Sequence, residues 1–254
     1  MPALFLGHGS PMNAVEDNEF RQGWADAARS IPRPEAILCV SAHWETGGVF
    51  LTASERPHTI HDFYGFPEEL YEVRYPAPGH PALASRTAGL LRRAQAGLDG
   101  ERGLDHGCWS VLRAMYPEAD VPVVQLSLDS TRPPALHYEL ALGLEPLRDQ
   151  GVLILGSGNV VHNLRLADFG REDGHDWAVR FDAEVKKRFM AGDHPGLIAY
   201  EALTPEARRA VPTPEHYLPF LYVLAQQAEG EEIAVFNDRT LMASISMTCF
   251  RVGR

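Results

Sequence analysis

Short apolar runs alternate along this chain with longer segments in which apolar residues recur at helical spacing. The runs predict strands at residues 3–7, 36–41, 49–53, 121–126, 152–156, 233–236 and 244–252. The periodic segments predict helices at residues 20–30, 81–96, 108–115, 134–150, 177–191 and 215–228. Because the strands are apolar throughout, we expect a mostly parallel central sheet that is buried on both faces and flanked by helices. The chain contains no linker, low-complexity tract or internal repeat, so a single α/β domain over residues 1–254 is expected.

Two segments depart from this regular alternation. Residues 58–81 are rich in proline, glycine and aromatic residues, and they predict a long ordered loop of the kind that often carries function. Thr213 and Pro214 are typical of a helix N-cap followed by proline at the first helical position. The helix at 215–228 is therefore expected to begin directly after them.

Six histidines occur in short, turn-like motifs that are spread over most of the chain. The motifs are Gly7-His8-Gly9-Ser10-Pro11, Ser41-Ala42-His43-Trp44, His61-Asp62-Phe63, Asp105-His106-Gly107, residues 156–163 around His162, and Pro214-Glu215-His216-Tyr217. The motifs around His8, His43 and His162 follow predicted strands. In open α/β sheets, ligands bind beyond the carboxyl ends of the strands. These motifs are therefore expected to meet at that edge of the sheet and to form a metal site there.

Four histidines are candidate metal ligands, and each has an alternative. The glycines that flank His8 allow a tight turn, in which the histidine could instead be exposed to solvent. His43 could be a hydrogen-bonded core residue. His162 follows a glycine-rich turn that matches neither a P-loop nor the dinucleotide fingerprint, and it is a candidate ligand or catalytic acid–base residue. His216 is predicted in the first helical turn, where the helix dipole favours a neutral ring, and Glu215 is the alternative ligand.

Two further histidines are weaker candidates. His106 is a candidate catalytic residue that binds or orients the substrate. His61 is either a site residue or part of a hydrogen bond within its own loop.

Imidazole has an ordinary pKa near 6.5, so roughly three-quarters of it is neutral at pH 7 and gathering several rings costs little free energy of deprotonation. A metal readily offsets that cost, so one shared divalent metal explains the motifs better than several unrelated histidines do.

Composition narrows the range of partners. The formal net charge is −11, and no Lys/Arg block or basic-aromatic stripe occurs, so a nucleic-acid partner is not expected. No apolar stretch approaches the ~20 residues that span a bilayer, and no signal peptide is recognisable, so a membrane partner is not expected either. Three widely spaced cysteines form no CxxC pair or disulfide framework, which favours a reducing, cytoplasmic location. The sequence does not indicate an oligomeric state.

The motifs as a set resemble the class III (LigB-like) extradiol ring-cleavage dioxygenases, and most closely the 4,5-DOPA extradiol dioxygenase-like branch of that superfamily. The stretches that carry the resemblance are the six histidine motifs together with Tyr75-Pro76-Ala77-Pro78-Gly79 and Val123-Val124-Gln125-Leu126-Ser127. Each tetrapeptide is weak alone, but their order and spacing are specific and span nearly the whole chain.

The resemblance implies one divalent metal per chain, bound by His8, His43 and His216, with His162 as a further ligand or as the acid–base residue. The wider superfamily has a glutamate where this chain presents His216. Two histidines and a carboxylate suit Fe(II), whereas an imidazole-rich set also suits Zn(II), so either metal is expected, with Fe(II) for turnover. The resemblance further implies that the protein opens the ring of a DOPA-like catechol with O₂, and that His106 orients a substrate oxygen.

Two other classes of function stay open on the residues alone. A zinc-dependent hydrolase of an amide or ester would use metal-bound water as its nucleophile and would consume no oxygen. A non-catalytic metal-binding protein would fill all four coordination positions with protein ligands.

Overall fold

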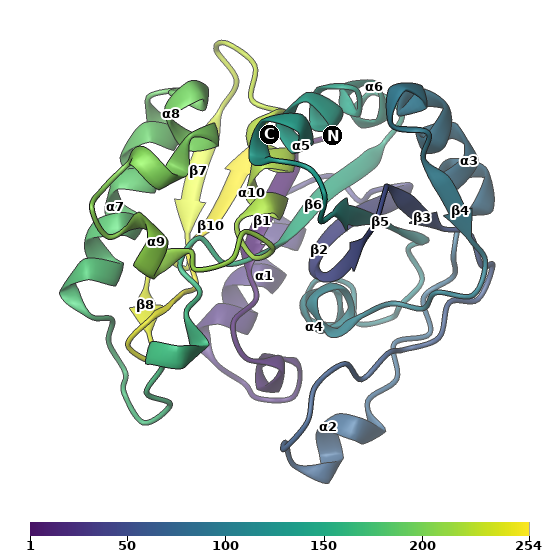
Figure 1. Ribbon diagram of the computed structural model, residues 1–254. Coiled ribbons are helices and arrows are strands. Elements are labelled where there is room, and N and C mark those ends of the chain that lie inside the picture. Colours follow the sequence, from purple (N-terminus) through teal and green to yellow (C-terminus); the bar gives the residue numbers. More distant parts are fainter. Residues whose placement is uncertain (254) are drawn as a thin grey trace.

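An eight-stranded sheet runs through the centre of the computed structural model, which describes residues 1–253 (Figure 1). Its order is β4-β3-β5-β2-β6-β1-β10-β7, and the pairs β5-β2, β2-β6, β6-β1 and β3-β4 are parallel. The strands are β1 (Ala3–Gly7), β2 (Ala36–Thr46), β3 (Phe50–Thr52), β4 (Gly97–Asp99), β5 (Val123–Asp129), β6 (Val152–Gly158), β7 (Ile233–Phe236) and β10 (Cys249–Val252), with β8 (Thr240–Leu241) and β9 (Ile245–Ser246) paired separately. The predicted α/β fold with a mostly parallel central sheet is confirmed.

The central strands send alternate side chains into two separate hydrophobic cores. In β1, Phe5 belongs to one core and Leu4 to the other; in β2, Leu38 and Cys39 divide in the same way. Successive side chains of a strand point to opposite faces of the sheet, so a strand with a core on each side needs apolar residues at every position. This burial on both faces explains why the strands appear in the sequence as unbroken apolar runs.

Helices cover both faces of the sheet (Figure 1). The core that contains Leu4 is covered by α1 (Glu19–Arg29), α2 (Glu68–Glu72) and α4 (His106–Met115). The core that contains Phe5 is covered by α3 (Pro81–Leu90), α5 (Pro134–Leu142), α6 (Glu145–Arg148), α7 (Asp176–Met190), α8 (His194–Ile198), α9 (Ala207–Ala210) and α10 (Leu218–Leu224). Short 3-10 turns occupy η1 (Pro11–Ala14), η2 (Arg92–Ala94), η3 (Leu164–Leu166) and η4 (Tyr200–Ala202).

Three predicted helices differ from their expected bounds by more than two residues. The helix predicted at 81–96 stops at Leu90, and β4 follows after η2. The helix predicted at 134–150 is two helices, because Pro146 lacks the N–H that would continue the first one. The helix predicted from residue 215 begins only at Leu218.

Local competition for hydrogen bonds explains the late start of α10. The Thr213 hydroxyl donates to the Glu215 carboxylate, and no side chain caps the start of α10. The carbonyl oxygen of His216 accepts the Asn159 N–H at 2.9 Å, which ties this residue to the end of β6. His216 therefore lies in a turn before the helix, and the expectation that it occupies the first helical turn is wrong.

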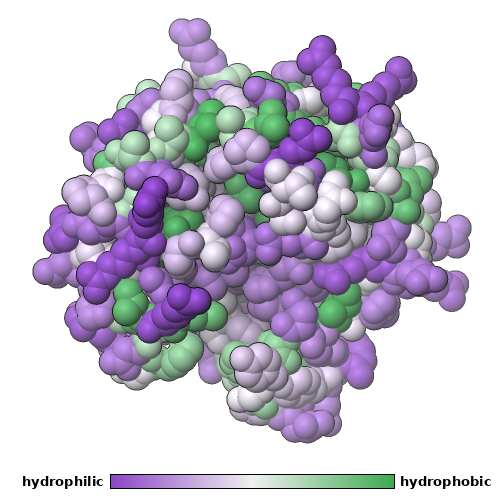
Figure 2. All heavy atoms as spheres, viewed as in Figure 1, coloured by the Kyte–Doolittle hydropathy of each residue, from purple (hydrophilic) through white to green (hydrophobic). Residues whose placement is uncertain are grey.

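Residues 58–81 form the predicted long loop, interrupted by α2, which projects from the body in Figure 1. The loop is tied to the body near both ends, where Ile60 N–H donates to the Leu104 carbonyl and Gly79 N–H donates to the Glu55 carbonyl. On the face shown in Figure 2, apolar residues appear as separate small areas among polar ones. Among the described residues, no helix combines the length and the apolar character that crossing a bilayer requires.

Candidate metal centre

The turn after β1 holds His8 in a rigid, buried position. The His8 N–H donates to the Gly158 carbonyl at 3.1 Å, which continues the pairing between β1 and β6. Gly9 has φ +58°, and a Cβ atom there would lie 2.4 Å from the sulfur of Met247, so this position requires glycine. His8 is only 2% exposed, which excludes the alternative of a solvent-exposed turn histidine.

A bulge in β2 directs His43 toward His8. The register of β2 against β5 shifts between Val40 and Glu45, and His43 lies within this shift. The strand thus continues past the predicted end at residue 41, and the irregular backbone re-aims the side chain at the edge of the sheet. The side chain is 21% exposed, so His43 is not a fully enclosed core residue.

A buried carboxyl group joins the segments that carry His43 and His106. The Asp105 carboxylate accepts the Ser41 hydroxyl at 2.7 Å, the Gln125 amide at 2.7 Å and the Cys108 N–H at 3.1 Å. Burial raises the pKa of Asp105, while the hydrogen bonds from Ser41 and Gln125 oppose that rise. These contacts fix Ser41 of β2 and Gln125 of β5 against the start of α4.

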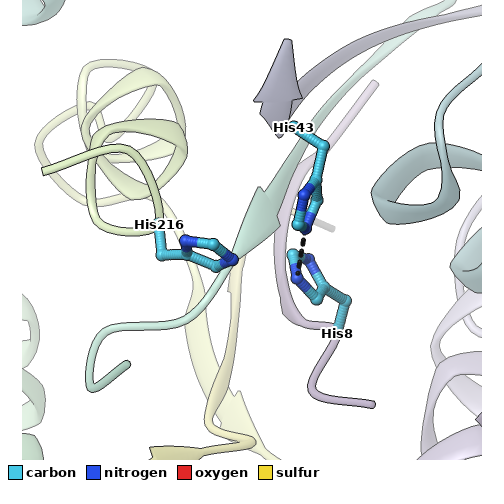
Figure 3. Close-up of side chains that lie close together, drawn as sticks. All are labelled: His8, His43 and His216. Atoms are coloured by element: carbon cyan, nitrogen blue, oxygen red, sulfur yellow. Dashed lines mark hydrogen bonds between the residues drawn. The ribbon is translucent and has the colours of Figure 1, made fainter. Parts of the chain in front are cut away.

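His8, His43 and His216 converge from three distant segments, as Figure 3 shows. One ring nitrogen of each lies within 4.8 Å of the others. The Nε2 atoms of His8 and His43 are 3.1 Å apart, the contact that is dashed in Figure 3. We call these three residues the histidine trio.

The partners of the Nδ1 atoms determine which nitrogen of each ring is free. Ser157 donates its hydroxyl proton to the Gly107 carbonyl at 2.5 Å, so its oxygen accepts the His8 Nδ1–H at 2.9 Å. In His216, Nδ1 lies 3.1 Å from the Glu215 carboxylate. A carboxylate oxygen only accepts, so that nitrogen carries the proton. The Nε2 atoms of His8 and His216 therefore present lone pairs to the centre of the trio.

This arrangement fits a bound metal ion. The Nε2 atom of His216 is buried and has no hydrogen-bond partner among the described residues. Buried polar atoms without a partner are rare, and they call for an explanation such as an ion. Nitrogen ligands about 2.1 Å from one cation lie about 3.0–3.4 Å apart in octahedral or tetrahedral geometry, a range that includes the observed 3.1 Å between the Nε2 atoms of His8 and His43. The carboxylates of Glu215 and Asp62 behind the rings would offset part of the cation charge.

The electrostatics of the trio also favour metal binding. Burial, followed by the neighbouring imidazoles, holds the pKa of His8, His43 and His216 well below the ordinary value of histidine. The rings are therefore neutral at pH 7, and a metal would have few protons to displace.

His162 lies beside the trio rather than within it. Its ring stacks on that of His216, with centroids 3.5 Å apart and planes at 9°. It shares a potential ligand group with Glu215 and His216, but not with His8 and His43. Burial, and then the influence of His106, lower the pKa of His162 to about 4, so this ring is also neutral at pH 7.

His106 and Asp62 lie on the other flank of the trio. The His106 ring lies 3.9 Å from that of His43, between centroids, and it is 5% exposed. One Asp62 oxygen accepts the His106 backbone N–H at 2.9 Å, and the other lies 3.1 Å from Nδ1 of the same residue. Burial alone would raise the pKa of Asp62, yet the contacts with His106 and then His43 lower it to about 2.

Aromatic residues of the loop at 58–81 complete this flank. The Phe63 ring packs edge-on against His106 at 5.6 Å between centroids, and Phe66 and Tyr71 pack against Phe63. His61 does not belong to the trio. Its Nε2 donates a hydrogen bond to the Val73 carbonyl at 3.0 Å, which agrees with the alternative that His61 makes a hydrogen bond within its own loop.

The sequence did not identify the residues that orient the histidines. Ser157 and Asp62 lie inside two of the histidine motifs, but the motifs themselves point to histidine as the functional residue. The sequence offers Glu215 only as an alternative ligand, whereas in the structure its carboxylate lies 3.1 Å from Nδ1 of His216. The one available signal was adjacency: each of the three residues lies within five positions of a motif histidine.

The family model described as the catalytic LigB subunit of aromatic ring-opening dioxygenase matches residues 2–245. The chain belongs to the LigB family. A protein of Escherichia coli K12 named 4,5-DOPA dioxygenase extradiol is 48% identical over 260 residues, which cover 100% of this chain and 95% of that protein. A protein of Beta vulgaris with the same name is 37% identical and covers 92% of this chain and 90% of its own length.

A solved structure of similar shape agrees with this assignment. The crystal structure of an uncharacterized protein from Escherichia coli K12 matches with a TM-score of 0.87 at 42% sequence identity, and the match covers all of both chains. Membership of the LigB family makes this chain an extradiol ring-opening dioxygenase, whose reactants are an aromatic compound and O₂. It also agrees with the metal dependence that the histidine trio suggests.

Proposed function

We propose that this LigB-family protein is an Fe(II)-dependent dioxygenase that cleaves the ring of a DOPA-like catechol beside its hydroxyl groups. The observation that carries the proposal is the convergence of three neutral imidazoles, each of which places one ring nitrogen within 4.8 Å of a ring nitrogen of the other two. Relatives named 4,5-DOPA dioxygenase extradiol support the choice of a catechol with an amino-acid side chain.

We propose that His8, His43 and His216 hold the metal. Three protein ligands leave coordination positions for substrate, as in other catalytic metal sites. When bound, Fe(II) supplies the electron transfer between catecholate and O₂ that spin restriction otherwise makes slow. The same imidazoles suit Zn(II), which lacks redox chemistry, so we expect zinc to be retained without supporting turnover.

The residues beside the trio would handle the protons of the substrate. His162 is neutral, with a pKa of about 4, so it enters the reaction as a proton acceptor for a catechol hydroxyl. His106 would orient the second hydroxyl, since its ring contacts His43 on the other flank. Phe63, packed against His106, would place an aromatic surface beside the substrate ring.

Oxygen uptake tests this function. The metal-free protein is loaded anaerobically with Fe(II), L-DOPA or another catechol is added, and oxygen is followed with an electrode. We expect oxygen to be consumed in step with loss of the catechol, whereas a Zn(II)-loaded sample and the His43→Ala variant stay inactive. A zinc hydrolase would consume none, so an Fe(II)-loaded protein that retains its metal but takes up no oxygen with any catechol would refute the proposal.

A further inference from the structure

Asp62 contacts His106 through both of its carboxylate oxygens. Oδ1 accepts the backbone N–H of His106 at 2.9 Å, at the first residue of α4. Oδ2 lies 3.1 Å from Nδ1 of the same imidazole, off the line of a straight hydrogen bond. The Asp62 side chain is 23% exposed and the His106 side chain 7%, so the contact is partly shielded from water. Asp62 thus ties the loop at 58–81 to α4 and to the His106 ring.

The chemistry of the carboxylate decides which nitrogen of His106 carries the proton. A carboxylate has only acceptor oxygens, so a lone pair on Nδ1 at 3.1 Å would be repelled, while an N–H there is attracted. The contact therefore favours the tautomer that carries its proton on Nδ1. In that tautomer Nε2 has a lone pair, and among residues 1–253 no hydrogen bond joins Nε2 to another residue. His106 consequently offers a hydrogen-bond acceptor to a guest beside the trio.

The same oxygen also faces the trio. Oδ2 of Asp62 lies 3.8 Å from Nδ1 of His43, beyond hydrogen-bond distance but near enough to favour an N–H there. One carboxylate thereby favours the same tautomer in two neighbouring rings, one a proposed metal ligand and the other not. His162, in contrast, makes no hydrogen bond or ion pair with a carboxylate in the described part of the chain, although one of its ring nitrogens lies within 4.8 Å of a Glu215 oxygen.

We propose that Asp62 is a positioning residue for ring cleavage: it locks His106 as the Nδ1–H tautomer, so that Nε2 accepts the hydrogen bond of a catechol hydroxyl. This inference rests on the proposed function for its substrate, but the tautomer itself is a property of the protein. The substrate hydroxyl that donates to His106 would lie close to the metal, because the centroids of the His106 ring and of the proposed ligand His43 are 3.9 Å apart.

The Asp62→Asn variant tests the positioning role of Asp62. Asparagine has nearly the same shape as aspartate, but it presents a donor instead of an acceptor to Nδ1 of His106. The backbone N–H of His106 is an obligatory donor, so the amide oxygen of asparagine must face it. The amide NH₂ then faces Nδ1, which must become the acceptor, and the proton moves to Nε2. His106 now presents a donor where the substrate hydroxyl needs an acceptor. We expect kcat to fall about 10²-fold or more while KM for the catechol changes far less.

Nitrogen-15 NMR of the histidine rings in the Zn(II)-loaded protein reads the tautomer directly, without turnover. We expect His106 to carry its proton on Nδ1 in the wild type and on Nε2 in Asp62→Asn, with one metal per chain in both. Asp62→Glu restores a carboxylate, so the Nδ1–H form and part of the lost kcat should return. Glu69→Gln removes an exposed carboxylate from α2 in the same loop and serves as the matched control, with no change in tautomer or kcat.

Different results would refute the positioning role of Asp62 and the dioxygenase function of the protein. An unchanged tautomer or an unchanged kcat in Asp62→Asn would overturn the positioning role, and so would loss of the metal or of the fold in both Asp62 variants. A wild-type protein that consumes no oxygen with any catechol would refute the dioxygenase function, while the NMR measurement would still report the tautomer.

Discussion

Ser157→Ala removes the hydrogen bond that orients a proposed metal ligand without touching the ligand itself. The Ser157 hydroxyl accepts the His8 Nδ1–H at 2.9 Å and donates to the Gly107 carbonyl at 2.5 Å. Without it, the His8 ring can rotate or place its proton on Nε2, where the proton blocks the metal. Loss of such an outer partner typically weakens metal binding 10–100-fold. That range corresponds to about 1.4–2.7 kcal/mol of binding free energy.

A second effect of the same variant is separable from the first. The Gly107 carbonyl loses the Ser157 hydroxyl but keeps its place as an acceptor within α4, so the variant costs about 0.5–1.5 kcal/mol of the free energy of unfolding in the metal-free protein. Urea denaturation without metal measures this term, and Zn(II) competition against a chromophoric chelator near pH 7 measures the affinity. Ser110→Ala is the control, because Ser110 is also buried, on α4, and among the described residues makes no hydrogen bond to the trio. A Ser157→Ala protein that binds Zn(II) as tightly as wild type would refute the tautomer argument.

Two further predictions concern the remaining imidazoles. Replacing His162 by alanine should lower kcat of the Fe(II)-loaded enzyme by about 10²–10⁴-fold with its metal content unchanged, and an unaltered kcat would remove His162 from proton transfer. The metal-free protein should lose stability as pH falls from about 6.5 to about 4. In this range the histidines of the unfolded chain bind protons, whereas the buried histidines of the folded protein stay neutral because their pKa is lowered. His162, whose pKa falls from 6.5 to about 4, would account for about 3 kcal/mol of that loss. Urea midpoints that stay constant between pH 7 and pH 4.5 would contradict this explanation.

Much of the fold could be predicted from the sequence because its causes are local. An apolar run such as residues 152–156 must be buried on both sides wherever it lies, and that requirement favours a central strand in a parallel sheet. The meeting of His8 and His43 at one edge followed from the same reasoning, since His8 follows β1 and His43 comes just after the apolar run of β2. Order and spacing of the motifs then indicated the LigB family, which the comparisons show.

Tertiary structure decided the start of α10 and the chemical state of each imidazole. Thr213 and Pro214 carry a local helix-start signal, but His216 is held outside the helix by Asn159, far away in the sequence. The tautomer of His8 depends on Ser157, 149 residues distant, and that of His106 on Asp62, 44 residues distant. A histidine in a sequence can carry its proton on either nitrogen. Only the acceptor that folding places beside one nitrogen determines which of them remains free to bind a metal or a substrate.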